Sequence, residues 1–342
     1  MDSVRNTIAE NFGGPASKLG TRQFELSECP DLSGKVGAIT GGSRGIGYAV
    51  AYTFLKNNIS KLYVISVSPD VMAAAKREIA SELGDDVAAR IEWKQCDLTN
   101  WPRVHKVAEE IKADTDRLDI LVNNAGRGVM TAQLTDYGVD RHMALNHMGH
   151  MVLTSGLLPL MKKTADEGNV VRITHQSSNA HQNAPSDTKF ASLEEINTDA
   201  GPNGQYGRSK LASILYTRYF ARKNGHPNVL MNATHPGFVS TKQSVEDVFE
   251  PYPRAGYIMS HVVDPIKKDQ WQGAVPTVYA ATTTTESGEW VCPPAIPEPG
   301  NKLAQSEELQ ENLMALTGKI YREKMNPVSA DKGQKFEDLV LT

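Results

Sequence analysis

The sequence predicts an α/β fold: a doubly wound parallel sheet with helices on both faces, in a single Rossmann-type domain. Short apolar runs alternate with amphipathic stretches from residue 34 onward, and strands alternating with helices of about 10–15 residues indicate parallel βαβ units. A glycine-rich turn follows the first apolar run, where a strand leads into a helix. No change of composition marks a linker between Gly34 and Cys292, so one domain is favoured over two.

The first half of this domain contains the more regular alternation. Each predicted strand is a short run rich in Val, Ile or Leu, and each predicted helix has helical spacing of its apolar residues. In chain order these elements are strand 35–40, helix 46–57, strand 61–67, helix 70–83, strand 91–96, helix 102–114 and strand 118–122.

The second half continues the alternation around two irregular segments. One is a polar insert at 178–204, and the other follows Pro236, where the letters EPYPRAGY indicate a loop with aromatic side chains. The regular elements are a long helix from about 136 to 163, strand 169–174, helix 206–224, strand 229–234, strand 289–292 and helix 302–324.

Composition excludes several classes of protein. With 36 Lys and Arg against 40 Asp and Glu, the chain has a formal net charge of −4. This charge argues against a protein that binds nucleic acids or coats anionic membranes. The chain has no apolar leader near its start and no apolar run of about 18 residues, which predicts a cytoplasmic protein without a membrane contact. The cysteines lack zinc spacing and are expected to be free thiols: Cys29, Cys96 and Cys292.

The turn after the first strand, residues 40–47, reads TGGSRGIG. Glycines at positions 41, 45 and 47 let the backbone turn tightly and let a pyrophosphate approach the positive end of the next helix. The alternative is a plain glycine-rich turn. The position between a strand and a helix favours the phosphate site.

Two more polar groups stand at the carboxyl ends of predicted strands. Asp97 and Leu98 follow the third strand, where a carboxylate can accept from an adenine amino group, and NNAG closes the fourth strand at 123–126. Each group alone is an ordinary helix cap or turn. Their order and their placement on the ligand-binding edge of an open α/β sheet indicate a nucleotide site.

Tyr206 and Lys210 lie four residues apart on a predicted helix, so their side chains share one face. An ammonium group beside a phenol favours the phenolate, and it lowers the phenol pKa from about 10 toward neutrality. A Tyr–Lys pair on the surface is the ordinary alternative. Ser178, which can hold a carbonyl oxygen, and Asn146 on the long helix favour a catalytic pair.

Together these motifs resemble the short-chain dehydrogenase/reductase superfamily over roughly residues 34–293. TGGSRGIG, Asp97, NNAG, Asn146, Ser178, YGRSK and HPGFVST follow one another in the order of that family. LNHMGHMVLT, SSNAH and HPGFVST are most similar to its retinol-dehydrogenase-like branch, as is the long interval between Ser178 and Tyr206. Fungal and plant reductases, including enzymes of secondary metabolism, share these features.

The resemblance implies a Ser–Tyr–Lys centre with a supporting Asn. Tyr206 would protonate a carbonyl oxygen or deprotonate an alcohol, and Lys210 would bind the nicotinamide ribose and lower the Tyr pKa. Ser178 would polarise the substrate carbonyl, and Asn146 would hold a water in a proton relay. Ser178 is preferred to Ser177 as the second serine of the pair. The cofactor contacts implied are Gly41, Ser43, Arg44, Ile46, Gly47, Ser66, Ser68, Asp97, Leu98, Asn124, Ala125, Gly126, Tyr206, Lys210, Pro236, Gly237, Val239 and Thr241.

The residues around the second strand favour NADP(H) over NAD(H). NAD-binding members usually carry an acid at the end of this strand to take the ribose 2′-hydroxyl. Here the strand ends with Ser66 and Ser68, which can donate to a phosphate, and Asp70 lies a little beyond. Arg44 resembles the basic residue that NADP-binding members place against the 2′-phosphate.

Three other features have ordinary interpretations. His142, His147 and His150 have no acidic or Cys partner at useful spacing, so we expect packing or solvent-facing roles and no metal. The aromatic residues of 249–257 and Trp271 fall where the family places its substrate lid, and both pocket lining and loop packing stay open. The methionines of the long helix are expected in the core or at a subunit contact: Met143, Met148, Met151 and Met161.

The sequence thus predicts an NADP(H)-dependent oxidoreductase acting on a small, fairly apolar ketone, aldehyde or alcohol. The alternatives are another reaction on the same fold (enone or imine reduction, epimerisation, cyclisation) and a non-catalytic NADP(H) sensor. We expect an N-terminal arm at 1–33, an NADP-binding domain at 34–325 with a substrate loop at about 242–285, and a tail at 326–342. Dimers or tetramers are common in the family, and the arm and last helix leave this state open.

Overall fold

The computed structural model describes residues 24–128, 130–237, 239, 269–331 and 339–342. Its centre is a sheet of eight strands in the order β3-β2-β1-β4-β5-β6-β7-β8, in which only the last pair, β7 and β8, is antiparallel. The chain moves outward from β1 to β3 and then returns to the other side of β1 with β4. This reversal is the switch point at which open α/β sheets bind ligands, and it confirms the predicted doubly wound fold.

The first seven strands match the predicted apolar runs closely, whereas the short strand β8 was not predicted. All five residues of β1 are buried, as expected for a parallel strand covered on both faces, whereas only the first residue of the edge strand β3 is fully buried. The strands are β1 (Val36–Thr40), β2 (Lys61–Ser66), β3 (Ile91–Gln95), β4 (Ile120–Asn123), β5 (Val171–Gln176), β6 (Val229–Thr234), β7 (Trp290–Cys292) and β8 (Ile296–Pro297).

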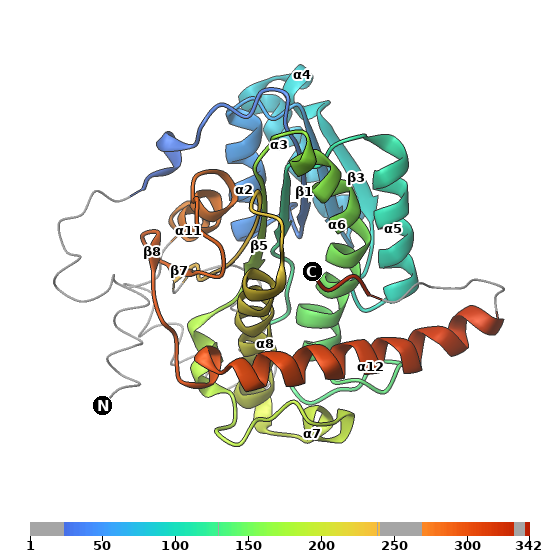
Figure 1. Ribbon diagram of the computed structural model, residues 1–342. Helices are drawn as coiled ribbons and strands as arrows, with labels where there is room; N and C mark the ends of the chain where they lie inside the picture. The colour runs from blue at the N-terminus through green and yellow to red at the C-terminus, as the bar shows by residue number, and fades with distance from the viewer. Residues whose placement is uncertain (1–23, 129, 238, 240–268, 332–338) are drawn as a thin grey trace, which may run out of the picture.

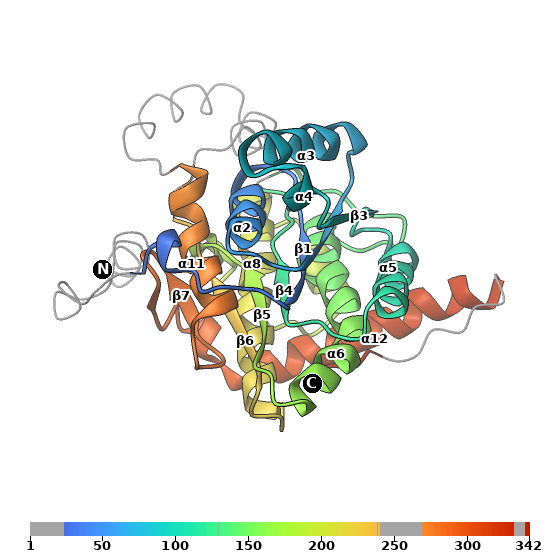
Figure 2. The same cartoon turned by 90° about the horizontal axis from the view of Figure 1, so that it is seen from above.

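Helices cover both faces of the sheet (Figures 1 and 2). One apolar core packs α2 (Gly45–Lys56), α3 (Pro69–Leu83) and α11 (Gln270–Thr282) on one face, and the other packs α5 (Trp101–Asp114), α6 (His150–Asp166) and α8 (Gly201–Lys223) on the opposite face. Adjacent residues of β1 point to different cores, Ala38 to the second and Ile39 to the first. A short helix, α4 (Asp85–Ala88), follows α3.

The predicted helix from 136 to 163 starts later than expected, after Asp140, and its first part is π-helical. A bridge joins Leu134 to Asp140, and residues Met143–Gly149 form a wider π-helical segment before α6 begins. The Asp140 carboxylate accepts from the Met143 N–H at 2.9 Å and so starts the helix late. At the other end of the segment, a Cβ on Gly149 would lie 2.3 Å from the Leu98 carbonyl oxygen, so the backbone passes very close to the loop after β3.

The polar insert at 178–204 is partly helical. It contains a short 3₁₀ helix, Asn179–Asn183, and a helix α7, Leu193–Asn197. Because α8 begins at Gly201, before the predicted start, Tyr206 lies inside this helix.

The last helix, α12 (Glu307–Asp331), crosses the outer side of α8 and extends beyond the predicted end at 324 (Figure 1). A 3₁₀ turn, Leu303–Gln305, precedes it. The final residues return to α6, where the Val340 N–H donates to Ser155 Oγ at 2.6 Å. No helix in the described ranges is both long and apolar enough to span a membrane. The division into arm, domain and tail stays a prediction.

Candidate active site

The candidate site lies at the carboxyl ends of the central strands. β1, β4, β5 and β6 are neighbours in the sheet and parallel. Their last residues, Thr40, Asn123, Gln176 and Thr234, are therefore brought to one edge. The glycine turn, the NNAG turn and Ser178 follow directly on three of these strands.

The glycine turn and the NNAG turn are bonded to one another. Thr40 Oγ1 accepts from the backbone N–H groups of Asn124 and Ala125, both at 2.9 Å. The Asn124 side-chain Nδ2 donates to Thr40 O at 2.9 Å. A Cβ on Gly47 would lie 2.3 Å from the Gly41 carbonyl oxygen and 2.4 Å from Asn124 Nδ2, so only glycine fits there. The two motifs thus form one rigid surface at the start of α2.

The remaining residues of the glycine turn surround the N-terminus of α2. Ser43 is buried, Ile46 is half-buried, and Arg44 is exposed as the N-cap residue. Gly41 and Gly45 both have positive φ, +69° and +57°, which glycine adopts without strain. The first N–H groups of α2 therefore face the strand edge, as a phosphate-binding turn requires.

Tyr206 and Lys210 lie together on α8, as the four-residue spacing predicts. Lys210 Nζ is 5.6 Å from the centre of the Tyr206 ring, and it donates to the Gln176 carbonyl at 2.9 Å. Lys210 is buried, whereas Tyr206 is half-buried. Burial lowers the pKa of the Lys210 ammonium to about 8.

The two serines after β5 have different environments. Ser177 is buried, and its hydroxyl donates to the Lys210 carbonyl at 2.7 Å. Ser178 is half-buried, and its Oγ caps the following 3₁₀ helix by accepting from the Ala180 N–H at 3.1 Å. Ser178 is thus the more exposed of the two serines.

Asn146 lies at the centre of the π-helical segment and bonds two other parts of the site. Its Oδ1 accepts from the Arg127 N–H at 3.0 Å, and its Nδ2 donates to Arg127 O and to Ser209 Oγ at 3.1 and 3.0 Å. Gly126 lies between this side chain and Lys210, because a Cβ there would be 3.2 Å from Asn146 Oδ1 and 3.4 Å from Lys210 Nζ. The structure therefore brings Asn146 and Lys210 together across Gly126.

The other predicted cofactor contacts form the outer parts of the same edge. Ser66 Oγ accepts from Trp93 Nε1 at 3.0 Å, and Ser68 caps α3 by accepting from the Val71 N–H at 3.4 Å. The exposed Asp97 accepts from the Thr99 N–H and hydroxyl, both at 2.8 Å, which fixes the loop after β3. The next residue, Leu98, is buried.

The HPG turn after β6 lies beside α11. Pro236, Gly237 and Val239 are all half-buried, and the Val239 side chain packs against Gly273. Thr241 and the aromatic segment 249–257 lie outside the described residues. Trp271 contacts two tyrosines of α2 edge-on, with ring centroids 5.1 Å from Tyr52 and 6.3 Å from Tyr48. Trp271 thus lies in helix α11 rather than in a loop, and it packs against α2; pocket lining stays a prediction.

Gln176 is a site residue that the sequence marked only as a departure from the family pattern. Its Oε1 accepts from the hydroxyls of Thr234 and Thr277 at 3.1 and 2.7 Å. Its buried Nε2 has no hydrogen-bond partner among the described residues. An orphaned buried donor at this edge fits a site that takes a polar ligand.

The predicted histidines have packing roles in a buried cluster. His147 Nε2 lies 2.9 Å from Thr317 Oγ1 on α12, and His150 bonds to Thr40 and Asn146. His175, which replaces the family's Asn, lies 3.2 Å from Asn123 Nδ2. Periodicity could not reveal these partners, since they come from distant parts of the chain.

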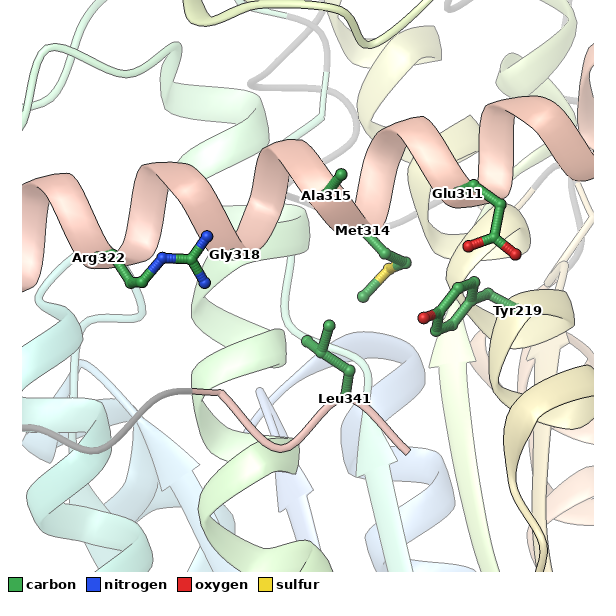
Figure 3. Close-up of a pocket in the computed structure, with 7 residues that line it drawn as sticks. All are labelled: Tyr219, Glu311, Met314, Ala315, Gly318, Arg322 and Leu341. Atoms are coloured by element: carbon green, nitrogen blue, oxygen red, sulfur yellow. The ribbon is translucent and has the colours of Figure 1, made fainter.

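A hollow far from this edge is lined by residues of α8, α12 and the C-terminus, and Figure 3 shows it. Its α8 residue, Tyr219, lies thirteen positions after Tyr206 on one helix, which is about 20 Å along the axis. This hollow is therefore separate from the candidate active site. The lining residues are Tyr219, Glu311, Met314, Ala315, Gly318, Arg322 and Leu341.

Comparison with known proteins agrees with this geometry. The family model described as short chain dehydrogenase matches residues 35–192. An oxidoreductase of Neurospora crassa, bli-4, whose name includes a mitochondrial location, is 61% identical over 100% of this chain and 84% of its own length. Mouse retinol dehydrogenase 14 is 31% identical over 68% of this chain and 69% of its own length.

A solved structure of a Mycobacterium paratuberculosis protein shares the fold. It has a TM-score of 0.68 and 23% identity, over 88% of this chain and 98% of that one. The chain therefore belongs to the short-chain dehydrogenase/reductase superfamily of oxidoreductases, in its retinol-dehydrogenase-like branch.

Proposed function

We propose that this protein is an NADP(H)-dependent oxidoreductase, a carbonyl reductase or alcohol dehydrogenase for a small, fairly apolar ketone, aldehyde or alcohol. The observation that carries the proposal is the placement of a half-buried Tyr206 beside the buried ammonium of Lys210 at the strand edge. A binding protein that only senses NADP(H) has no use for such an acid–base pair.

The described residues fit a nicotinamide cofactor. Lys210 Nζ has three donors, of which one is bonded to Gln176 O, so two can bind ribose hydroxyls. The first turn of α2 and the Gly41 turn would hold the pyrophosphate, and the orphaned Gln176 Nε2 lies at the same edge. When bound, the nicotinamide supplies or accepts the hydride at the carbon of the substrate.

The proton steps belong to the residues of this chain. In reduction the Tyr206 hydroxyl donates a proton to the substrate oxygen, and in oxidation it accepts that proton. The Ser178 hydroxyl donates a hydrogen bond to the same oxygen and orients it. Lys210 stabilises the phenolate that remains, and Asn146 holds the segment beside it.

Preference for NADP(H) is supported by the surroundings of β2. Its last residue, Ser66, is not an acid, and Ser68 caps α3 so that the positive end of this helix faces the same edge. Arg44 is exposed at the start of α2. A ribose 2′-phosphate placed here would meet hydroxyls, a guanidinium and a helix N-terminus. Asp70, in the first turn of α3, is the one acid nearby in sequence.

Titration with NADPH and with NADH, followed by nicotinamide fluorescence, tests this preference. We expect wild type to bind NADPH more tightly than NADH, and Arg44→Ala to weaken NADPH binding about tenfold while changing NADH binding less than twofold. Arg322→Ala, an exposed arginine of α12, is the matched control and should change neither. Tighter binding of NADH would contradict the assignment.

The cellular setting is also a proposal. The prediction from composition is cytoplasmic, whereas the name of the Neurospora relative includes a mitochondrial location. A role in secondary metabolism rests on the family resemblance alone. Fractionation of cells that express the tagged chain decides between the two compartments, because the protein would follow either a cytosolic or a mitochondrial marker.

A further inference from the structure

His150 connects two halves of the candidate active site. It is the first residue of α6, directly after the π-helical segment, and only 3% of it is exposed. Its Nε2 lies 2.9 Å from Thr40 Oγ1 at the end of β1, and its Nδ1 lies 3.1 Å from the Asn146 carbonyl oxygen.

The hydrogen bonds around Thr40 determine where the ring proton lies. A hydroxyl has one donor and two acceptor positions, and the N–H groups of Asn124 and Ala125 use both acceptor positions of Thr40 Oγ1. The Thr40 proton must therefore point to His150 Nε2, which is the acceptor. The ring proton is then on Nδ1, where it donates to the Asn146 carbonyl.

The opposite tautomer, with the proton on Nε2, cannot form a hydrogen bond at either ring nitrogen. A proton on Nε2 would be a third donor aimed at Thr40 Oγ1 and would leave the hydroxyl proton without an acceptor. An unprotonated Nδ1 would then face the Asn146 carbonyl oxygen, lone pair against lone pair, at 3.1 Å. Buried polar groups without partners are costly, so only the Nδ1–H form satisfies every group.

The ring also stays uncharged in the neutral range. Burial lowers the pKa of His150 to about 4; the hydrogen bond to the Asn146 carbonyl opposes this shift, and the nearby Lys210 ammonium adds to it. The other titratable groups that face this cluster, His147 and His175, have pKa values lowered by burial as well. Protonation would place a donor against the Thr40 hydroxyl, which has no acceptor position left.

The geometry of the π-helical segment depends on this side chain. The backbone N–H of His150 bonds to His147 O, so the Asn146 carbonyl receives the His150 side chain instead. Through Thr40 the same ring supports the turn at Asn124 and Ala125. One neutral imidazole thus links the cofactor turns to the segment that carries Asn146.

We propose that His150, as the Nδ1–H tautomer, is a positioning residue that fixes the NNAG turn and the Asn146 segment relative to one another. The inference rests on the proposed function, because it gives these two parts their roles in cofactor binding and proton transfer. It differs from the catalytic assignment in that His150 touches neither cofactor nor substrate and acts through Thr40 and Asn146.

Nitrogen-15 spectra of the ring test the tautomer without cofactor or substrate. In uniformly labelled wild type, with signals assigned by their loss in His150→Asn, we expect a protonated Nδ1 and an unprotonated Nε2. Neither signal should shift between about pH 6 and about pH 8. A protonated Nε2, or titration within this range, overturns the proposal.

Two pairs of variants test the positioning role. His150→Asn can keep the donor toward Asn146 but loses the acceptor for Thr40, and Thr40→Val loses the hydroxyl itself. We expect both to weaken NADPH binding about tenfold or more. Thr40→Ser, which keeps the hydroxyl, should stay within about twofold of wild type. The control His226→Gln, whose ring faces the Asp166 carboxylate at the surface, should bind as wild type does.

The outcomes separate this proposal from the proposed function. If wild type binds no nicotinamide nucleotide, the proposed function fails, while the ring spectra still decide the tautomer. If wild type binds NADPH and the folded fractions of His150→Asn and Thr40→Val bind it equally well, the ring is merely structural and the positioning role is wrong.

Discussion

The two adjacent serines after β5, Ser177 and Ser178, differ in burial and in hydrogen-bond partners. The Ser177 hydroxyl is buried and satisfies the Lys210 carbonyl, whereas Ser178 is half-buried beside the 3₁₀ turn. The backbone alternates along β5, so adjacent residues at its end point to different sides. Ser177 is therefore bonded to α8, and Ser178 is the serine that we propose contacts the substrate.

Substitution of each serine by alanine tests this division. Ser178→Ala should lower kcat/KM about 100-fold, because a hydrogen bond to the reacting oxygen is lost, and should leave NADPH affinity unchanged. Ser177→Ala should cost about 1 kcal/mol of unfolding free energy, with turnover of the folded protein within a few-fold of wild type. Urea denaturation and steady-state kinetics measure both. The reverse pattern would reassign the catalytic serine to position 177.

At the scale of single residues, the sequence predicted which side chains are suited to acid–base catalysis better than it predicted which hydrogen bonds buried side chains form. Tyr206 and Lys210 were predictable because a four-residue spacing on a helix places two side chains on one face. The hydrogen bonds of Gln176 and His150 were not predictable. Their partners come from β1, β6 and α11, which only the folded sheet brings near. Thr241 and the aromatic residues of 249–257 keep the status of predictions.

The elements next to the active site are the ones that depart from simple periodicity. Apolar spacing predicts one helix from 136 to 163, yet the chain forms the bridge at Leu134, the π-helical segment and then α6. The cause is local: the Asp140 cap and the contact of Gly149 with Leu98 fix where the helix starts and how it bends. Hydrophobic periodicity does not carry such information.

Gly207 controls how closely α8 approaches the turn after Ser178. A Cβ there would lie 2.6 Å from the Ala180 carbonyl oxygen and 2.7 Å from the Ala184 nitrogen, both backbone atoms. Gly207→Ala must therefore push α8 away and increase the distance between Tyr206 and Ser178. We expect turnover to fall about 100-fold, the size of loss that a displacement of about 1 Å causes.

Gly225→Ala is the matched control for this helix displacement. Among the described residues, no atom lies within 4 Å of the Cβ it would add. The variant should match wild type in turnover and in melting temperature. Equal turnover of Gly207→Ala and Gly225→Ala would show that the spacing between α8 and the Ser178 turn does not matter for the reaction.

At the scale of the whole molecule, the buried histidines make the free energy of unfolding depend on pH. Burial lowers the pKa of His147 to about 3 and the pKa values of His150 and His181 to about 4, and it lowers that of His175 well below its usual value. Below about pH 6.5 the unfolded chain binds protons at these rings, while the native protein does not. Acid therefore favours unfolding.

We expect the free energy of unfolding to fall between about pH 6.5 and about pH 4. Each such histidine contributes a loss of about 1.4 kcal/mol per pH unit in this window. Urea denaturation at a series of pH values measures the slope. A stability that is constant from pH 7 to 5 would contradict the neutral, buried state of the cluster.

The sequence predicted the last helix, α12, but not the surface on which it packs. α12 packs on α8, and its Thr317 bonds to His147 of the π-helical segment. In Figure 1 it crosses α8, the helix that contains Tyr206. Helix propensity predicted the element, and packing against α8 determines where it lies. The oligomeric state stays a prediction, and sedimentation tests it.

The central claim is that Tyr206 transfers a proton while NADPH gives its hydride to a carbonyl. Its most direct test is NADPH oxidation by wild type and Tyr206→Phe, with a panel of apolar aldehydes and ketones. We expect wild type to oxidise NADPH with at least one carbonyl. Tyr206→Phe should bind NADPH as tightly but turn over at least about 100-fold more slowly. Equal oxidation by both proteins, or no binding of NADPH by wild type, would contradict the account.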